Sequence, residues 1–244
     1  MRFAWLLLAL VACHPGAGDD YPIIPQGGDD GTLNPMADAA TPADGTSGDG
    51  GMLVGRVCLT QDLRQPTPCA GTGVADLVVT LGTSTATTVD DGSFMMVAPG
   101  GTSLVWHVSG TTSGGDDLVP SDLPLGTTHI IPALTSDRYL DIKNSNAVIE
   151  NAGEGSVVVY ATSGGLPVPG ATATIAPTGS YLAMGDTTNA LNWVQGATGA
   201  LGASWIPGAT AGAASVTLTL GSQHQTVSLP VVDGGITFAT VVFP

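Results

Sequence analysis

Cysteine is the residue type in this sequence that most clearly indicates covalent chemistry, and the surroundings of the first of three, Cys13, are the most informative. An unbroken apolar run from Phe3 to Val11 begins directly after Arg2, and the small residue Ala12 separates it from Cys13. A run of this length is typical of an export signal and is well short of the roughly 20 residues that cross a bilayer as a helix. The thiol of Cys13 therefore stands where an export signal would end.

The residues Leu10-Val11-Ala12-Cys13 resemble a lipobox, the motif that directs cleavage before the cysteine of a bacterial lipoprotein and acylation of that cysteine. The resemblance implies a signal peptide over residues 1–12 and a membrane partner reached through the lipid on Cys13. It also implies the outer membrane of a bacterial envelope, because His14 is not the Asp that commonly retains lipoproteins in the inner membrane. The alternative is a plain secretory signal, which gives no reason for a cysteine directly after Leu-Val-Ala.

The other two cysteines, Cys58 and Cys69, would form an even pair in an oxidising compartment once Cys13 is acylated. We expect a disulfide between them, whose ring of about a dozen residues would constrain the unfolded chain by roughly 3 kcal/mol. Two free thiols are a weaker alternative outside the cytoplasm. A metal site is weaker still, because no second Cys or His pair lies nearby in the sequence.

The sequence holds no recognisable pattern of catalytic or metal-binding residues. The Gly-x-Ser-x-Gly and His-Glu-x-x-His motifs are absent. The four histidines, His14, His107, His129 and His224, show no ligand spacing with one another. We therefore expect neither an enzyme nor a cofactor or metal.

The charge balance argues against nucleic acid as a partner. Five Lys plus Arg stand against twenty Asp plus Glu, which makes the net charge −15. So few cations cannot form a basic patch, so nucleic acids and anionic lipid headgroups are poor partners.

Aromatic side chains could instead form a platform for a sugar. Trp193 and Tyr181 lie in the Gly- and Thr-rich stretch Thr178–Ala200, which we interpret as a long loop. We expect the two residues to pack against the rim of the fold, and the alternative is that they are exposed there and form a ligand platform. Trp106 and Trp205 are expected in the core, because apolar residues lie two places away from each.

Residues 13–51 are predicted to be a disordered acidic tether that carries the lipid at its first residue. After Cys13 the segment contains seven Asp and no Lys or Arg, and no apolar periodicity. As a flexible coil it would span roughly 30–35 Å on average. Calcium binding is a weaker alternative, because the spaced Asp ligands and the closing Glu of an EF-hand loop are missing.

The remaining residues alternate between apolar and polar with the period of β-strands. We predict an all-β fold with a first β-sandwich over residues 52–134 and a second over residues 155–244. Residues 135–154 are the expected connection, with a short helix within Thr135–Ala147. The predicted strands of the first sandwich are Leu53–Leu59, Val74–Leu81, Thr85–Val89, Ser93–Val97, Thr102–Ser109 and Thr128–Leu134. Gly110–Gly126, between the last two, is predicted to be a loop. Those of the second begin with Ser156–Ala161 and Ala171–Ile175 and end with the runs around Val216, Val227 and Ile236.

The first of these regions resembles the carboxypeptidase regulatory-like domain, a transthyretin-like, or Ig-like, β-sandwich. The resemblance rests on Val74–Val79, on Thr88–Phe94 with its Asp-Gly turn, and on Pro99-Gly100. The second region matches at Pro167–Ala171, although Thr198–Gly202 lacks the Asp of the family's turn. The resemblance implies two tandem accessory modules without catalytic activity.

Together these features predict an outer-membrane or surface lipoprotein that presents two β-sandwiches for a structural, adhesive or protein–protein interaction role. The alternative is a carbohydrate-binding accessory lipoprotein that uses Trp193 and Tyr181. Its partner in the envelope would be a protein or a glycan. We further expect each sandwich to fold on its own.

Overall fold

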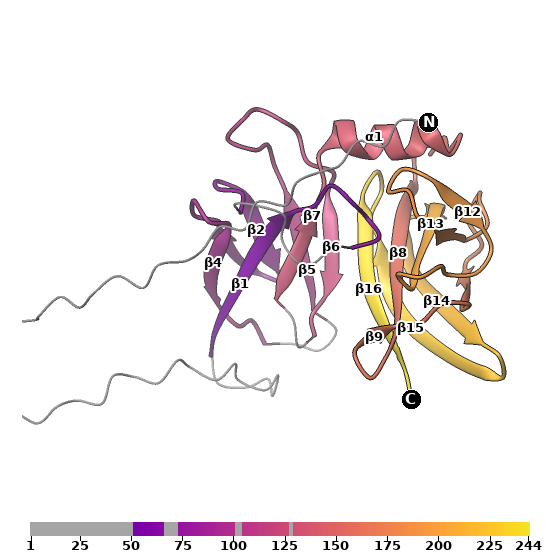
Figure 1. The fold of residues 1–244 in the computed structure, drawn as a ribbon. Helices are drawn as coiled ribbons and strands as arrows, with labels where there is room; N and C mark the ends of the chain where they lie inside the picture. Colours follow the sequence, from indigo (N-terminus) through magenta and orange to yellow (C-terminus); the bar gives the residue numbers. More distant parts are fainter. Residues whose placement is uncertain (1–50, 66–72, 101–103, 127–128) are drawn as a thin grey trace, which may run out of the picture. The chain divides into compact units, whose positions relative to one another are not determined.

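The computed structural model describes residues 51–65, 73–100, 104–126 and 129–244. Among them the fold is all-β with one helix, α1, as the alternation of the sequence predicts (Figure 1). The elements of the first half are β1 (Met52–Leu59), β2 (Val78–Leu81), β3 (Ser84–Thr87), β4 (Ser93–Val97), β5 (Val105–Ser109), β6 (Ser121–Pro124), β7 (Ile130–Ala133) and α1 (Ser136–Ser145). Those of the second half are β8 (Glu154–Ser163), β9 (Leu166–Pro167), β10 (Thr172–Ala176), β11 (Met184–Asp186), β12 (Trp193–Gln195), β13 (Ala203–Thr210), β14 (Gly212–Leu220), β15 (Gln223–Val231) and β16 (Ile236–Phe243).

The first half consists of two sheet layers around one core. The sheet β4–β1–β7 provides one layer, and β3, β2, β5 and β6 provide the other. Trp106 on β5 is fully buried between them, and Phe94 meets its ring edge-on at a centroid distance of 5.3 Å. The predicted turn at Asp90-Asp91-Gly92 connects β3 to β4, and Gly92 adopts a φ of +79° that favours glycine. The expectation that Trp106 belongs to the core is confirmed.

The second half has a second core between the sheet β10–β14–β15 and the strands β8, β13 and β16. Its members include Val216, Leu218, Ile206 and Phe243. The central strand β8 is buried on both faces, which explains why its sequence is an apolar run instead of an alternation.

A third cluster lies on the other face of β8, beneath α1. Thr135 caps the helix by accepting a hydrogen bond from the Arg138 backbone N–H, as a Thr at an N-cap does. The helix buries Tyr139 and Ile142 against the sheet. The cluster includes side chains from both halves: Leu63, Val119, Leu134, Tyr139, Ile142, Val148, Val158, Trp193, Ala203, Trp205, Ile236 and Phe238.

The two halves share one sheet, because β6 pairs in parallel with β16. The order of this sheet is β12–β11–β13–β8–β16–β6–β5–β2–β3, with β9 paired to β8, and β6 lies beside β16 in Figure 1. Residues 110–126, interpreted as a loop from the sequence, therefore contain the strand that links the halves. The contacts group the described residues into one compact unit. The independent folding of each half stays a prediction.

Candidate functional site

The aromatic platform considered as an alternative does not form, because Trp193 is buried. Its exposed fraction is 6%, and its ring lies 5.8 Å from that of Trp205, measured between centroids. The stretch interpreted as a loop contains β11 and β12, and this hairpin brings Trp193 beneath the end of α1. Asn146 at the C-cap fixes the hairpin: its amide donates to the Leu191 carbonyl at 2.7 Å and accepts from the Trp193 N–H at 2.8 Å. The alternative in which Trp193 is exposed is therefore wrong, and an Asn that no motif singled out holds the residue in place.

Tyr181, the other platform residue, is half-buried. Its hydroxyl accepts from the Ile149 N–H at 2.8 Å and donates to the Ile149 carbonyl at 3.1 Å. The ring lines a small hollow of about 150 Å³ beside β10. Tyr181 is thus available to a ligand in that hollow, without Trp193.

A polar network beneath α1 contains carboxylate, phenol and ammonium groups, and their hydrogen bonds are directed at one another. Glu150 Oε1 accepts hydrogen bonds from Tyr139 Oη and Ser156 Oγ, both at 2.7 Å. Trp205 Nε1 donates to Ser156 Oγ at 2.8 Å, and Lys143 Nζ lies 3.4 Å from Glu150 Oε2. Burial, reinforced by the Glu150 carboxylate, raises the pKa of Tyr139, so its hydroxyl stays a donor. The network ties α1 to β8 and β13.

Asp186 is a second carboxylate whose oxygens accept hydrogen bonds from inside the fold. Its Oδ1 accepts from the N–H groups of Gly199 at 2.8 Å and Ala203 at 2.9 Å, and its Oδ2 accepts from Leu201 N–H at 2.9 Å. The side chain is 6% exposed. The turn before β13, which contains no Asp of its own, is therefore held by a carboxylate from β11.

The histidines lie apart from one another in the described residues, and His14 lies outside them. His129 Nδ1 contacts the Val54 carbonyl oxygen at 3.0 Å, and His224 Nδ1 contacts Thr219 Oγ1 at 3.0 Å. His107 Nδ1 lies 2.7 Å from Asp122 Oδ1, across the β5–β6 pair. No group of three His, Cys, Asp or Glu residues among those described could hold a metal ion.

The His107–Asp122 pair predicts a pH-dependent contribution to stability. Its hydrogen bond to Asp122 raises the pKa of His107 above the ordinary value of 6.5. The stabilisation is therefore fully present below about pH 6.5 and is lost as the pH rises through the raised pKa. We expect His107→Gln to lower the free energy of unfolding more at pH 5.5 than at pH 8.5, by less than about 1 kcal/mol because the imidazole is 37% exposed.

Urea unfolding at the two pH values measures this difference. When Asp122→Asn is already present, His107→Gln should show little of the difference between the two pH values. His224→Gln, a change on the exposed side of β15, serves as the control. An equal loss at both pH values in His107→Gln would contradict the assignment.

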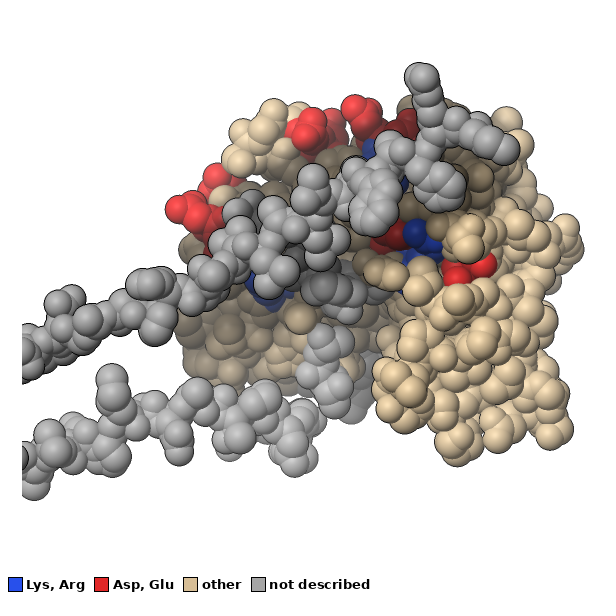
Figure 2. Space-filling model, viewed as in Figure 1, with Lys and Arg blue, Asp and Glu red and all other residues tan. Residues whose placement is uncertain are grey.

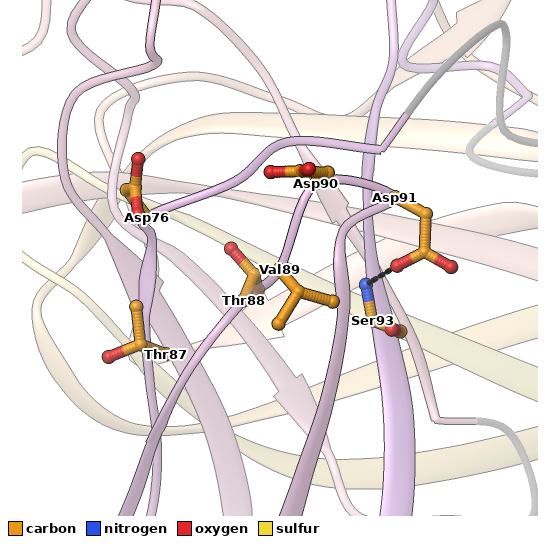
Figure 3. A pocket seen from close by; sticks show the side chains of 7 residues that line it. All are labelled: Asp76, Thr87, Thr88, Val89, Asp90, Asp91 and Ser93. Atoms are coloured by element: carbon orange, nitrogen blue, oxygen red, sulfur yellow. Dashed lines mark hydrogen bonds between the residues drawn. The ribbon is translucent and has the colours of Figure 1, made fainter.

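A shallow acidic depression lies beside the β3–β4 turn (Figure 3). Its lining residues are Asp76, Thr87, Thr88, Val89, Asp90, Asp91 and Ser93. Figure 3 shows the three carboxylates pointing in separate directions, and Asp91 Oδ1 accepts the Ser93 N–H at 2.8 Å. The carboxylates thus do not converge on a common point.

A group of exposed apolar side chains lies on the outward face of β1 and β4. Met52 stands opposite Val97, and Val54 stands opposite Met95. Each of the four side chains is more than half exposed, at 54%, 53%, 61% and 59% respectively. Contiguous exposure of this kind is a common property of protein interaction surfaces.

The remaining predicted sites lie largely outside the described residues. Cys13 and Cys69 are both outside them, whereas Cys58 is fully buried in β1. The Cys58–Cys69 disulfide and the lipid on Cys13 therefore stay predictions. Within the described ranges, the structure has no helix long and apolar enough to span a bilayer.

Comparison with known proteins finds no family model and no curated protein that matches this chain. The Bacillus anthracis TIE protein is a similar solved structure, 14% identical with a TM-score of 0.27, over 79% of this chain and 33% of that chain. A streptococcal ancillary pilin is 10% identical with a TM-score of 0.24, over 79% of this chain and 68% of that one. The group B streptococcus pilus 2b backbone protein is 13% identical with a TM-score of 0.24, over 83% and 88%.

This chain thus spans only a third of the TIE protein. At these identities and TM-scores the similarities carry no inference about function. The resemblance to the carboxypeptidase regulatory-like domain stays a prediction.

Proposed function

We propose that the chain is a bacterial envelope lipoprotein, anchored through a lipid on Cys13, that displays a non-catalytic β-fold for interaction with a partner. One observation carries the proposal that the fold is non-catalytic: polar groups inside it already form hydrogen bonds with one another. The Glu150 network and the Asp186 carboxylate are both committed to hydrogen bonds inside the fold. The motif Leu10–Cys13 supports the anchor, and the acidic segment after it would act as the tether.

The display role is further supported by the kind of surface that the fold exposes. The apolar residues on β1 and β4 offer a contact area for a protein partner. We place the protein in the outer membrane, since His14 is not the Asp that retains lipoproteins at the inner membrane.

The test of the anchor is Cys13→Ala in a bacterial host fed a fatty-acid analogue. We expect the wild-type chain to be labelled and recovered with membranes, because three acyl chains anchor a protein stably where one does not. The variant should accumulate as unprocessed precursor without label. Cys58→Ala controls for acylation of another cysteine and should leave labelling intact. Equal labelling of wild type and Cys13→Ala would refute the lipoprotein proposal.

A further inference from the structure

The outward face of the sheet β10–β14–β15 is a regular array of hydroxyl side chains. Two registers, β10 with β14 and β14 with β15, align three rows across the strands. The rows are Thr172–Thr219–His224, Thr174–Thr217–Thr226 and Ala176–Ser215–Ser228. Each of these side chains is exposed or half-buried, and all except Ala176 and His224 carry a hydroxyl. We call these nine residues the hydroxyl face.

The hydroxyls of this face are held in place before any partner arrives. Thr217 Oγ1 lies 2.9 Å from Thr226 Oγ1, and Thr219 Oγ1 lies 3.0 Å from His224 Nδ1. The β-branched Thr side chain is also restricted at χ1. A hydroxyl has one donor and two acceptor sites, so each bonded hydroxyl keeps capacity for an outside group. Little side-chain entropy would be lost on binding.

The surroundings of the hydroxyl face are almost free of charge. In a chain of net charge −15, residues 155–244 contain no Lys or Arg and two carboxylates, Asp186 and Asp233. Asp186 is buried, and Asp233 accepts the Gly153 N–H at 2.9 Å. Figure 2 shows the visible surface over β14 and β15 without acidic or basic side chains. The face has no carboxylate to attract a cationic partner and no cation to attract an anionic one. The net negative charge of the chain also repels anions.

The hollow beside Tyr181 adjoins this face and adds an apolar component. Thr174 belongs to both, and the hollow is otherwise lined by Ala173, Ile175, Thr178, Tyr181, Leu182, Ala183 and Ile206. Leu182 is 64% exposed, and none of the lining residues is charged. A ligand with hydroxyl groups at its rim and C–H groups on its faces would match hydroxyls beside an apolar hollow.

We propose that the hydroxyl face and the hollow beside Tyr181 bind a neutral polysaccharide. Its hydroxyls would exchange hydrogen bonds with the Thr217 and Thr226 row, and a ring at the β10 edge would contact Leu182 and Tyr181. The absence of charge favours a neutral glycan over an acidic one. The inference names the class of envelope partner for the display protein proposed above, and it depends on that proposal only for the location.

Affinity electrophoresis of the full chain, purified in mild detergent, tests this inference. The probes are hydroxyethyl cellulose, dextran and mannan as neutral polymers, and polygalacturonate as an acidic one. We expect at least one neutral polymer to retard the protein and polygalacturonate to leave its mobility unchanged. Removing both hydroxyls in Thr217→Val with Thr226→Val should weaken binding about tenfold, because Val keeps the branched shape and loses the hydrogen bonds. Thr85→Val with Thr87→Val on β3 is the matched control and should bind as the wild type does.

A second pair of variants tests the hollow without altering a strand. Leu182→Asp places a carboxylate at the rim and should abolish retardation, whereas Val194→Asp, at a site exposed to 61% on β12, should not. Three outcomes would overturn the inference. They are no retardation by any neutral polymer, equal retardation by polygalacturonate, and unchanged binding by the double Val variant.

The remaining alternative is that a second copy of the chain binds the same face. Sedimentation tests it by measuring whether the protein forms a dimer. Dimerisation that Thr217→Val with Thr226→Val abolishes would also overturn the polysaccharide inference. Since retardation does not require the lipid, its failure would leave the lipoprotein proposal standing. A failure of the Cys13 labelling test would likewise leave the binding result standing.

Discussion

Trp205→Ala should lower the free energy of unfolding by about 3–5 kcal/mol, the range for truncating a fully buried large aromatic side chain. Trp205 is 0% exposed. The change removes its ring contact with Trp193 and the hydrogen bond from its indole to Ser156 Oγ. Urea unfolding followed by circular dichroism measures the loss.

The position of Trp205 determines which parts of the fold Trp205→Ala should destabilise. Its cluster contains Leu63, Val119 and Leu134 from the first half. We therefore expect amide hydrogen exchange to rise in both halves. Trp106→Ala is the matched control, because Trp106 is also 0% exposed but lies in the core of the first half. If Trp205→Ala leaves exchange in residues 52–134 unchanged, the halves are independent, as the repeated strand pattern of the sequence predicts.

Asp186→Ala should cost about 3–5 kcal/mol of stability in the second half. The carboxylate satisfies three backbone N–H groups, and hydrogen bonds to a charged group contribute about 1.5–3 kcal/mol each. Water can replace part of the loss, which keeps the expected total below the sum of the three. Thermal unfolding monitored by tryptophan fluorescence gives the measurement.

Two variants control for the loss of charge at Asp186. Asp233→Ala removes a carboxylate with one exposed hydrogen bond to Gly153 and should change stability by less than about 0.5 kcal/mol. Asp186→Asn keeps the shape of the side chain but presents an amide donor to one of the N–H groups. Its stability should therefore lie between those of Asp186→Ala and Asp233→Ala. A stability of Asp186→Ala within error of Asp233→Ala would show that the turn does not depend on the carboxylate.

Local patterns in the sequence predict the elements well where the period of the side chains is clear. Ser93–Val97 is β4 with the bounds expected, and the helix begins after the Thr135 cap inside the predicted range. The burial of Trp106 and Trp205 follows from apolar neighbours two residues away. These predictions succeed because a strand places alternate side chains on one face whatever its partner is.

The sequence fails where burial depends on a distant partner. Short strands such as β6, β11 and β12 have little periodicity of their own, so residues 110–126 and 178–200 were expected to be loops. Trp193 is buried only because β12 packs beneath α1, through contacts of Asn146 that no local pattern encodes. The same limit applies to the polar network, since Glu150, Ser156 and Trp205 become neighbours only after α1 docks on the sheet.

By itself, then, the sequence determined the all-β class, the short helix after Thr135, the acidic charge and the lack of catalytic motifs. These properties depend on composition and on short-range periodicity. The tertiary structure alone decided that β6 joins β16, that Trp193 is buried and that three rows of hydroxyls align across β10, β14 and β15. Alternation predicts which residues share a face, but the register between strands is set by the hydrogen-bonded pairing of segments and by the packing of the whole core.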